Sequence, residues 1–378
     1  MAGPLTGYTV LDLTWGIPGP LAAMLMADYG AEVIRIVPPG GDVVTHPGYR
    51  VWNRGKKSVT LDLKKPEGKH VLEKLLAKAD VLVESFSPGV ADALGIGYEA
   101  VHKKFPRLVY TSISAYGQKG SDRDRPGYDG LVQARVGIHG QQTGHRKGPI
   151  YAGLAMPSYS TAFNVVIGAL TALYVRDTKT GNGQHVDTSL RDGALAMLNM
   201  NWWRTERGAD KFNITPWQKR LLVELFECAK GEWLQLHTGA QGAFDRMMEH
   251  IGFKEYVGVP MTGESWPEME KRTKRWFLEH SRDEGLAMLK RADVPSLPVL
   301  PPGGALHDAQ AYAMKFVETV DDPEIGPIEE IGLSLRFEKA PTAIRGSAPK
   351  KGQHTEELLS AAGYTKNDIA KLRAAAVI

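Results

Sequence analysis

The sequence has little cysteine, little excess charge of either sign and no long uninterrupted hydrophobic run. A single cysteine, Cys228, among 378 residues excludes a disulfide framework and indicates a reducing compartment, so we expect a cytoplasmic location. Cys228 follows a strand-like run, which favours a buried structural thiol over a catalytic one. The 46 basic and 43 acidic residues leave a formal net charge of +3, too small to indicate nucleic-acid binding.

Membrane and metal signals are also missing. The most apolar segment, near 162–175, is interrupted by Asn164 and Thr171, and we expect a buried core helix there and no membrane span. The N-terminus has no basic region followed by an apolar run, so we expect no signal peptide. The eleven histidines show no zinc-ligand spacing and Cys-x-x-Cys is absent, so we expect no metal.

What is present first is an alternation of strand-like and helix-like segments. It predicts parallel βαβ units in an open α/β sheet, where ligands bind beyond the carboxyl ends of the strands. We expect strands at 8–13, 32–37, 58–63, 81–84 and 108–113, with helices at 21–29 and 66–78. The loops that would meet at the carboxyl edge are 15–20, 38–42, 85–89 and 115–119.

The middle of the chain differs from its two ends. Residues 209–296 are mostly helical in pattern, with a strand at 233–236, and this change predicts a second, smaller domain. After residue 300 the chain returns to the first domain and ends in helices at 355–362 and 366–374. The predicted domains are therefore a large one from 1–205 and 301–378, and a small one from 206–300.

Short motifs in a fixed order carry a family resemblance. They are Pro4–Thr14 with Gly19-Pro20, Gly30–Ile36, Asn53–Ser58, Leu61–Lys64, Ala79–Phe86, Pro126–Asp129, Thr143-Gly144, Gly181–Asp187 and Gly352–Glu356. In this order they resemble the class III CoA-transferase superfamily, which includes formyl-CoA transferase, CaiB/BaiF proteins and α-methylacyl-CoA racemase. The resemblance implies coenzyme A or an acyl-CoA as substrate. It also implies a Rossmann-like large domain built from both chain ends, a small middle domain, and a dimer of interlocked rings.

The family's nucleophilic aspartate has no counterpart here. In transferring members an aspartate just before an apolar helix attacks the thioester and forms an anhydride, which is reactive enough to return the acyl group to CoA. The resemblance places this aspartate at Pro157 or Ser158, and the segment 153–160 holds no acidic residue. A Ser158 ester would be less reactive than a thioester. The alternative is that Pro157 and Ser158 start a helix, with the hydroxyl as its cap.

Tyr128 and Asp129 stand where the racemase branch has a His-Asp pair. A racemase needs two acid/base groups on opposite faces of the substrate carbon, so the missing histidine and aspartate disfavour racemisation. Asp129 is a candidate acid/base, orienting or replacement catalytic group, with Tyr128 beside it. The alternative role for Asp129 is to cap the helix that follows it.

Coenzyme A binding is predicted from one basic loop and one strand end. Cations suit the phosphates of CoA, although such a cluster is also typical of a solvated surface. The candidates are Arg35, Asn53, Arg54, Lys56 and Lys57, with Phe86 and Ser87 after the fourth strand. Two polar residues of the family are missing, since Ala93 replaces a phosphate-binding arginine and Ile17 a glutamine. Trp15, Trp52, Trp202 and Trp203 indicate a large apolar pocket or, alternatively, plain core and interface positions.

Three hypotheses follow. The leading one is that the chain is the subunit without the aspartate in a hetero-oligomeric CoA-transferase, paired with a homologous chain that carries it. The second is a homodimeric acyl-CoA enzyme that uses another residue, with Asp129 as the candidate. The third is a module that binds acyl-CoA without catalysis.

Overall fold

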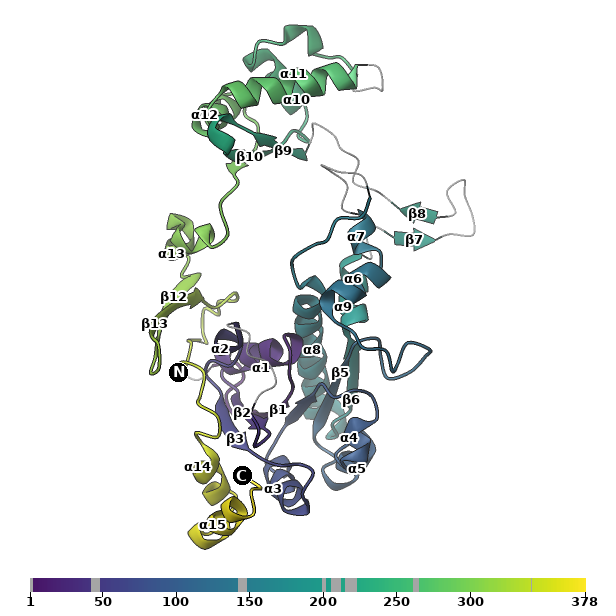
Figure 1. The fold of residues 1–378 in the computed structure, drawn as a ribbon, viewed down its shortest axis with the longest axis vertical. Coiled ribbons are helices and arrows are strands. Elements are labelled where there is room, and N and C mark those ends of the chain that lie inside the picture. The colour runs from purple at the N-terminus through teal and green to yellow at the C-terminus, as the bar shows by residue number, and fades with distance from the viewer. Residues whose placement is uncertain are drawn as a thin grey trace. The chain divides into compact units, whose positions relative to one another are not determined.

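The computed structural model describes residues 3–41, 48–141, 148–198, 202–204, 212–214, 223–260, 265–340 and 342–378. The chain forms two compact units (Figure 1). The first consists of Met1–Gly140, Ile150–Thr215 and Ala309–Ile378, and the second of Gln141–Pro149 and Pro216–Asp308. Each unit has a sheet and a hydrophobic core of its own.

A parallel sheet lies at the centre of the first unit. Its strands are β1 (Thr9–Leu13), β2 (Glu32–Val37), β3 (Lys57–Thr60), β4 (Val81–Glu84), β5 (Val109–Ser114) and β6 (His185–Ser189), in the order β3-β2-β1-β4-β5-β6. The five strands predicted from the sequence are all present, and β6 adds a sixth. The prediction of an α/β fold with a parallel central sheet is therefore confirmed.

Helices and two small hairpins complete the first unit. The helices are α1 (Pro18–Asp28), α2 (Gly48–Trp52), α3 (Pro66–Leu76), α4 (Val90–Ala93), α5 (Tyr98–Lys104), α6 (Asp129–Arg135), α7 (Ile138–Gln141), α8 (Met156–Val175), α9 (Leu190–Leu198), α13 (Ala309–Ala313), α14 (Thr355–Ala361) and α15 (Lys366–Ala374). The hairpins pair β7 (Trp202–Arg204) with β8 (Phe212–Ile214), and β12 (Val317–Asp322) with β13 (Gly326–Ile331).

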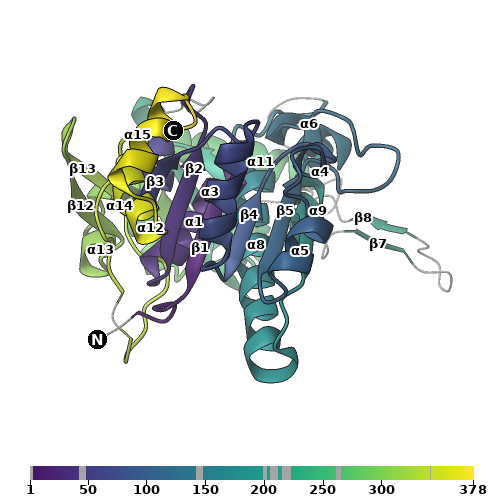
Figure 2. The ribbon, with the colours of Figure 1, turned by 90° about the horizontal axis from the view of Figure 1, so that it is seen from below.

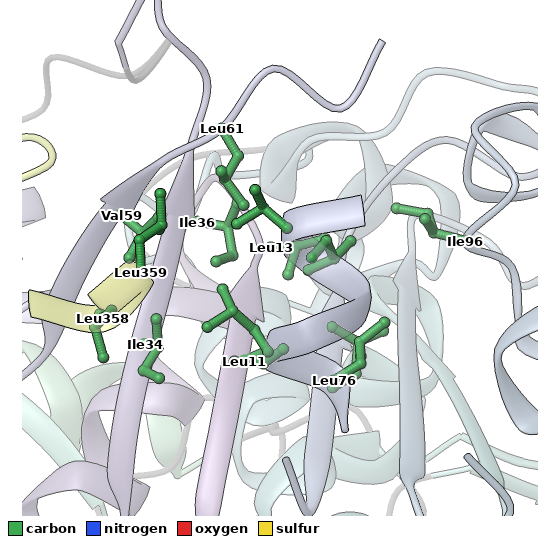
Figure 3. Packing of buried hydrophobic residues seen from close by; sticks show 14 of the residues in the cluster. Leu11, Leu13, Ile34, Ile36, Val59, Leu61, Leu76, Ile96, Leu358 and Leu359 are labelled. Atoms are coloured by element: carbon green, nitrogen blue, oxygen red, sulfur yellow. The ribbon is translucent and has the colours of Figure 1, made fainter. Parts of the chain in front are cut away.

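Both faces of the sheet are covered, which explains why its strands are continuously apolar. Successive side chains in a strand point to opposite faces. Val10 thus packs in a core with α1 and α8, while Leu11 packs on the opposite face with α3 and α14. Figure 3 shows this second core, in which residues of β1, β2 and β3 meet Leu358 and Leu359.

The C-terminal segment completes this unit beside β3. The Thr60 amide donates to the hydroxyl of Thr355, and the Ser58 amide donates to Nδ1 of His354. These bonds satisfy backbone groups at the edge of the sheet, where α14 lies next to β3 (Figure 2), and α15 packs on α14. The N-terminal and C-terminal parts of the chain therefore build one unit together.

The second unit is an antiparallel sheet packed against helices. Its strands are β9 (Val223–Glu227), β10 (Trp233–His237) and β11 (Ser296–Pro298), and its main helices are α10 (Ala243–His250), α11 (Trp266–Glu279) and α12 (Arg282–Arg291). Phe226 and Phe277 meet in its core with ring centroids 4.6 Å apart. Cys228 is buried in the same core, as predicted, and burial raises the pKa of its thiol.

Helix α8 is long and apolar. Together with the turn that follows it, Met156–Thr180 is long and apolar enough to cross a membrane by length and composition, a test that core helices of soluble proteins also pass. One side of α8 packs on the sheet through Ala162, Val165 and Ala169, and the other side is exposed, so the predicted helix is present but is buried on one side only. The helix places its N-terminus at the carboxyl edge of the sheet, where the candidate site lies.

Candidate active site

A pocket of ~420 Å³ opens at the carboxyl ends of β1, β4 and β5. Three of the four loops predicted to meet at this edge supply its lining. The lining residues are Trp15–Pro18, Trp52, Ser85–Pro88, Ile113–Ala115, Arg123, Arg125–Asp129, Ser158 and Leu190. The fourth predicted loop, 38–42, is not among them, and Asp42 lies outside the described residues. A mostly apolar cleft with a few polar groups is the usual form of a small-molecule site.

The loop after β1 is held against the loop after β4. The Trp15 amide donates to the hydroxyl of Ser85 over 2.9 Å, and the Trp15 indole N–H donates to the carbonyl of Ser85 over 3.0 Å. Gly19 lets α1 start directly beside the strand end, because a Cβ there would lie 2.3 Å from the Cβ of Thr14. Two neighbouring parallel strands thereby form one continuous wall of the pocket.

The carboxylate of Asp129 lies at the first turn of α8. The Ser158 amide donates to one oxygen of Asp129 over 2.8 Å, and the Ser158 hydroxyl donates to the other over 2.7 Å. Gly193 lets α9 pack closely on the same part of α8, because a Cβ there would lie 2.3 Å from the hydroxyl of Thr161. The structure thus brings together two residues that lie 29 positions apart in the sequence.

This contact corrects two helix-capping alternatives. Ser158 is not the cap of α8, since its hydroxyl donates to Asp129, although Pro157 does occupy the first turn as predicted. Asp129 makes no capping bond in its own helix α6. It instead accepts hydrogen bonds at the start of α8, where exposed N–H groups and the helix dipole favour a negative charge.

Tyr128 stands beside this carboxylate at the mouth of the pocket. Its side chain is 63% exposed, which is unusual for a large aromatic residue. Phe86, Ser87 and Ile17 also line the pocket. Ile17 replaces a glutamine of the family pattern, so one of the two missing polar residues belongs to this site. Ala93, at the end of α4, is exposed and is not among the lining residues.

The predicted basic residues lie elsewhere, and most of them are already paired. Lys56 donates to Asp12 over 2.8 Å, and Arg35 donates to the same carboxylate over 3.1 Å. Burial alone would raise the pKa of Asp12, but the Lys56 ammonium and the Arg35 guanidinium outweigh it and hold the pKa at about 2. Arg54 is buried against Asp28 at 2.7 Å.

The other two residues of the basic loop, Asn53 and Lys57, also have partners within the protein. Asn53 accepts a hydrogen bond from Lys56 and donates to the carbonyl of Tyr49. Lys57 is partly exposed and pairs with Glu32 and Glu357. None of the five residues that were predicted to bind the phosphates of CoA lines this pocket. Their contacts instead fix the end of α2, where Trp52 does line it.

Arg123 and Arg125 are pocket cations that the sequence reasoning missed. Arg123 is half-buried and pairs with the exposed Asp124, and Arg125 is exposed and pairs with the buried Asp122. A surface pair such as Arg123–Asp124 contributes only about 0–1 kcal/mol, so an anionic ligand competes with it at little cost. The available signal was the alternating run 122–125 directly before the Pro126–Asp129 motif.

A second set of polar groups lies just behind the pocket loop. Glu84, at the end of β4, is almost fully buried and accepts a hydrogen bond from the Phe86 amide over 2.8 Å. Ser112 hydrogen-bonds to Glu84 and lies 2.9 Å from Nε2 of His185. Burial raises the pKa of Glu84 to about 7, with further increases from Asp187 and Asp92, against the hydrogen bonds of Ser112 and Phe86.

In the wild type we expect the free energy of unfolding to fall as the pH rises from about 4.5 to 7. Glu84→Gln is expected to remove this fall. The folded pKa of about 7 lies above that of an unfolded glutamate, so the buried carboxyl stabilises the fold below the unfolded pKa. This contribution is lost as the pH rises through 7, and from pH 5 to pH 8 it amounts to about 2–3 kcal/mol. Urea denaturation at the two pH values measures it as the difference between wild type and variant.

The matched control for this experiment is Glu329→Gln, which alters an exposed carboxyl on β13. It should leave the pH dependence of the free energy of unfolding as in wild type. Equal pH dependence in wild type and Glu84→Gln would show that Glu84 is ionised in the folded protein throughout this range.

In the part of the chain that the structure describes, no group of three or more His, Cys, Asp or Glu residues is arranged to hold a metal ion. The chemical groups that line the pocket are one carboxylate, two guanidiniums, several hydroxyls and an aromatic wall. The carboxylate is the group among them suited to covalent attack on an acyl carbon.

Comparisons with known proteins agree on one protein family. The family model described as CoA-transferase family III matches residues 5–355. The chain is 29% identical over 401 residues to the succinyl-CoA–D-citramalate CoA-transferase of Chloroflexus aurantiacus, covering 99% of this chain and 98% of that protein. It is 28% identical over 403 residues to the succinyl-CoA–L-malate CoA-transferase beta subunit of the same organism, covering 99% and 98%.

Among solved structures, a CaiB/BaiF family protein from Brucella suis matches with a TM-score of 0.81. The two chains are 26% identical, and the match covers 96% of this chain and all of the other. The family model spans most of the sequence, and the solved relative has the same fold around its parallel sheet. The chain therefore belongs to CoA-transferase family III.

Proposed function

We propose that this protein moves CoA between carboxylic acids, with the carboxylate of Asp129 as the covalent carrier. The observation that carries the proposal is the pair of hydrogen bonds from Ser158, which hold this carboxylate at the first turn of α8. The family resemblance places the nucleophilic aspartate at this same turn. Asp129 therefore supplies from α6 the group that position 158 lacks.

The chemistry balances without a further reagent. An Asp129 oxygen attacks the thioester carbonyl carbon, the C–O bond forms, and the C–S bond breaks to release the CoA thiolate. The thiolate attacks the Asp129 carbonyl of the anhydride and expels the donor acid, leaving a CoA thioester on Asp129. The acceptor carboxylate then attacks this thioester, and the released thiolate takes the acceptor acyl group and frees the Asp129 carboxylate.

The surrounding residues have distinct proposed roles. Phe86 and Ser87 contact CoA from the loop after β4, and Arg123 and Arg125 meet its phosphates, which guanidinium groups suit. Direct contact of CoA with the predicted basic cluster stays a prediction. The buried ion pairs of that cluster support an indirect role, in which they hold Trp52 in the pocket wall.

We propose a dimer in which a second chain covers α8. Along the helix, large apolar side chains recur at exposed positions, namely Tyr159, Phe163, Ile167 and Tyr174. Such a contiguous exposed stripe is typical of an interface. The proposed dimer has interlocked rings, with a large domain from 1–205 and 301–378 and a small domain from 206–300. We place it in the cytoplasm, in keeping with the single cysteine.

A second candidate function is that of the subunit without a nucleophile in a hetero-oligomeric transferase. Both oxygens of Asp129 already accept hydrogen bonds from Ser158, which reduces their reactivity as nucleophiles. One of the relatives is also named as the beta subunit of a transferase. In this case a homologous chain carrying the aspartate would complete the enzyme.

Activity of the purified chain alone separates the two candidates. The protein is incubated with an unlabelled acyl-CoA and the same acid in radiolabelled form, and label entering the thioester is measured. Exchange by the isolated chain supports Asp129 as the carrier. Exchange that occurs only after co-expression with a homologous aspartate-bearing subunit supports the second candidate and contradicts the first.

A further inference from the structure

The aromatic wall of the pocket is rigid although part of it faces solvent. Trp15 is 44% exposed, yet two hydrogen bonds to Ser85 fix its backbone and its indole ring. Trp52 is buried at the end of α2, and the next residue, Asn53, accepts a hydrogen bond from Lys56. An exposed aromatic ring that is held in place presents a preformed apolar surface to a ligand.

Three of the pocket hydroxyls already take part in hydrogen bonds within the protein. Ser85 accepts from the Trp15 amide, Ser114 accepts from the Gly117 amide over 2.9 Å, and Ser158 donates to Asp129. A polar acyl group buried among these residues would lose its bonds to water and regain few of them. Burying polar groups without such compensation is unfavourable. The lining near Asp129 therefore favours an apolar acyl group.

The two pocket cations do not change this preference. Arg125 is exposed, Arg123 is half-buried, and each pairs with an aspartate, so neither is a desolvated clamp for a carboxylate on the acyl group. A carboxylate recognised deep in a pocket needs a buried and oriented partner. No basic residue other than these two is found among the lining residues of the described chain.

We propose that the acyl group handled at this site is bulky, apolar and aromatic, such as an arylalkanoyl group, and not a short dicarboxylic acyl group. This inference rests on the proposed CoA transfer and names its substrate class. Trp15 and Trp52 form the faces on which the aromatic ring packs, and Tyr128 closes the pocket beside Asp129. The cavity volume of ~420 Å³ falls in the range of small-molecule sites.

The test compares phenylacetyl-CoA with succinyl-CoA in the exchange assay, each with its own labelled acid. The expected kcat/KM is roughly 10- to 100-fold higher for phenylacetyl-CoA, the scale on which an apolar pocket discriminates. Trp52→Ala should abolish most of this preference by lowering the phenylacetyl value, whereas Trp52→Phe should retain it. Arg125→Ala should raise KM for both thioesters equally, because it acts on their shared CoA part.

The failure of this inference is distinct from the failure of the proposed function. Exchange of succinate at least as fast as phenylacetate would overturn the aromatic substrate class while leaving CoA transfer intact. If neither acid exchanges, calorimetry with the two acyl-CoAs decides. Tighter binding of phenylacetyl-CoA that Trp52→Ala removes would support the inference without transfer, and equal affinities would overturn it.

Discussion

Replacing Asp129 by asparagine is expected to lower CoA exchange by at least about 1,000-fold, as the loss of a covalent catalytic group does in other enzymes. The amide has nearly the same shape and its oxygen still accepts a bond from Ser158, but it is too weak a nucleophile to form the anhydride. Folding and acyl-CoA binding should persist, so calorimetry should give an affinity close to that of the wild type. The measurement is label exchange under saturating thioester.

The control is Asp321→Asn, an exposed aspartate on β12, which should exchange at the wild-type rate. A double variant sharpens the experiment. Ser158→Asp in the Asp129→Asn background returns a carboxylate to the first turn of α8, and part of the lost activity should return with it. Asp129→Asn activity within about ten-fold of wild type would be too high for the loss of the nucleophile and would contradict its assignment.

Asp12→Asn is expected to lower the free energy of unfolding by about 3–5 kcal/mol, the usual result of leaving a buried charge without its partner. Asp12 is fully buried and takes hydrogen bonds from both Lys56 and Arg35. The neutral amide would take from these two buried cations the carboxylate that both of them contact. Urea denaturation at pH 7 measures the change, where the wild-type carboxylate is fully ionised because its pKa is about 2.

An exposed pair provides the comparison. Glu73 and Lys104 form an ion pair at the surface, so Glu73→Gln should change the free energy of unfolding by about 0–1 kcal/mol. Adding Lys56→Met to Asp12→Asn removes one of the two buried cations that Asp12 contacts and should recover part of the lost stability. A change near that of Glu73→Gln for Asp12→Asn would mean that water reaches this ion pair.

The sheet could be predicted from sequence because its physical cause is local. A strand covered on both faces is apolar throughout, and the loops Gly16–Pro20 and Pro38–Gly41 mark where such runs end. The carboxyl-edge rule then placed three of the pocket loops correctly. The antiparallel strand β11 was harder, because it is only three residues long and lies in a region of helical pattern.

The site could be predicted only in part, because its contacts join distant segments. Asp129 and Ser158 were both named from sequence, but their hydrogen bonds depend on how α6 packs on α8, which no local pattern encodes. The basic loop was read as a phosphate site because its partners were unknown. Asp12 and Asp28 neutralise these cations from β1 and α1, so the charges that the sequence displays are not free in the fold.

The most direct test of the account is chemical trapping on Asp129. The purified chain is incubated with acyl-CoA and quenched with borohydride, which reduces a thioester on the aspartate to an alcohol and leaves homoserine. Peptide mass spectrometry should find this change at Asp129 in wild type and not in Asp129→Asn. Active exchange with an unmodified peptide at residue 129, or with the modification at another residue, would contradict the assignment of the covalent step to Asp129.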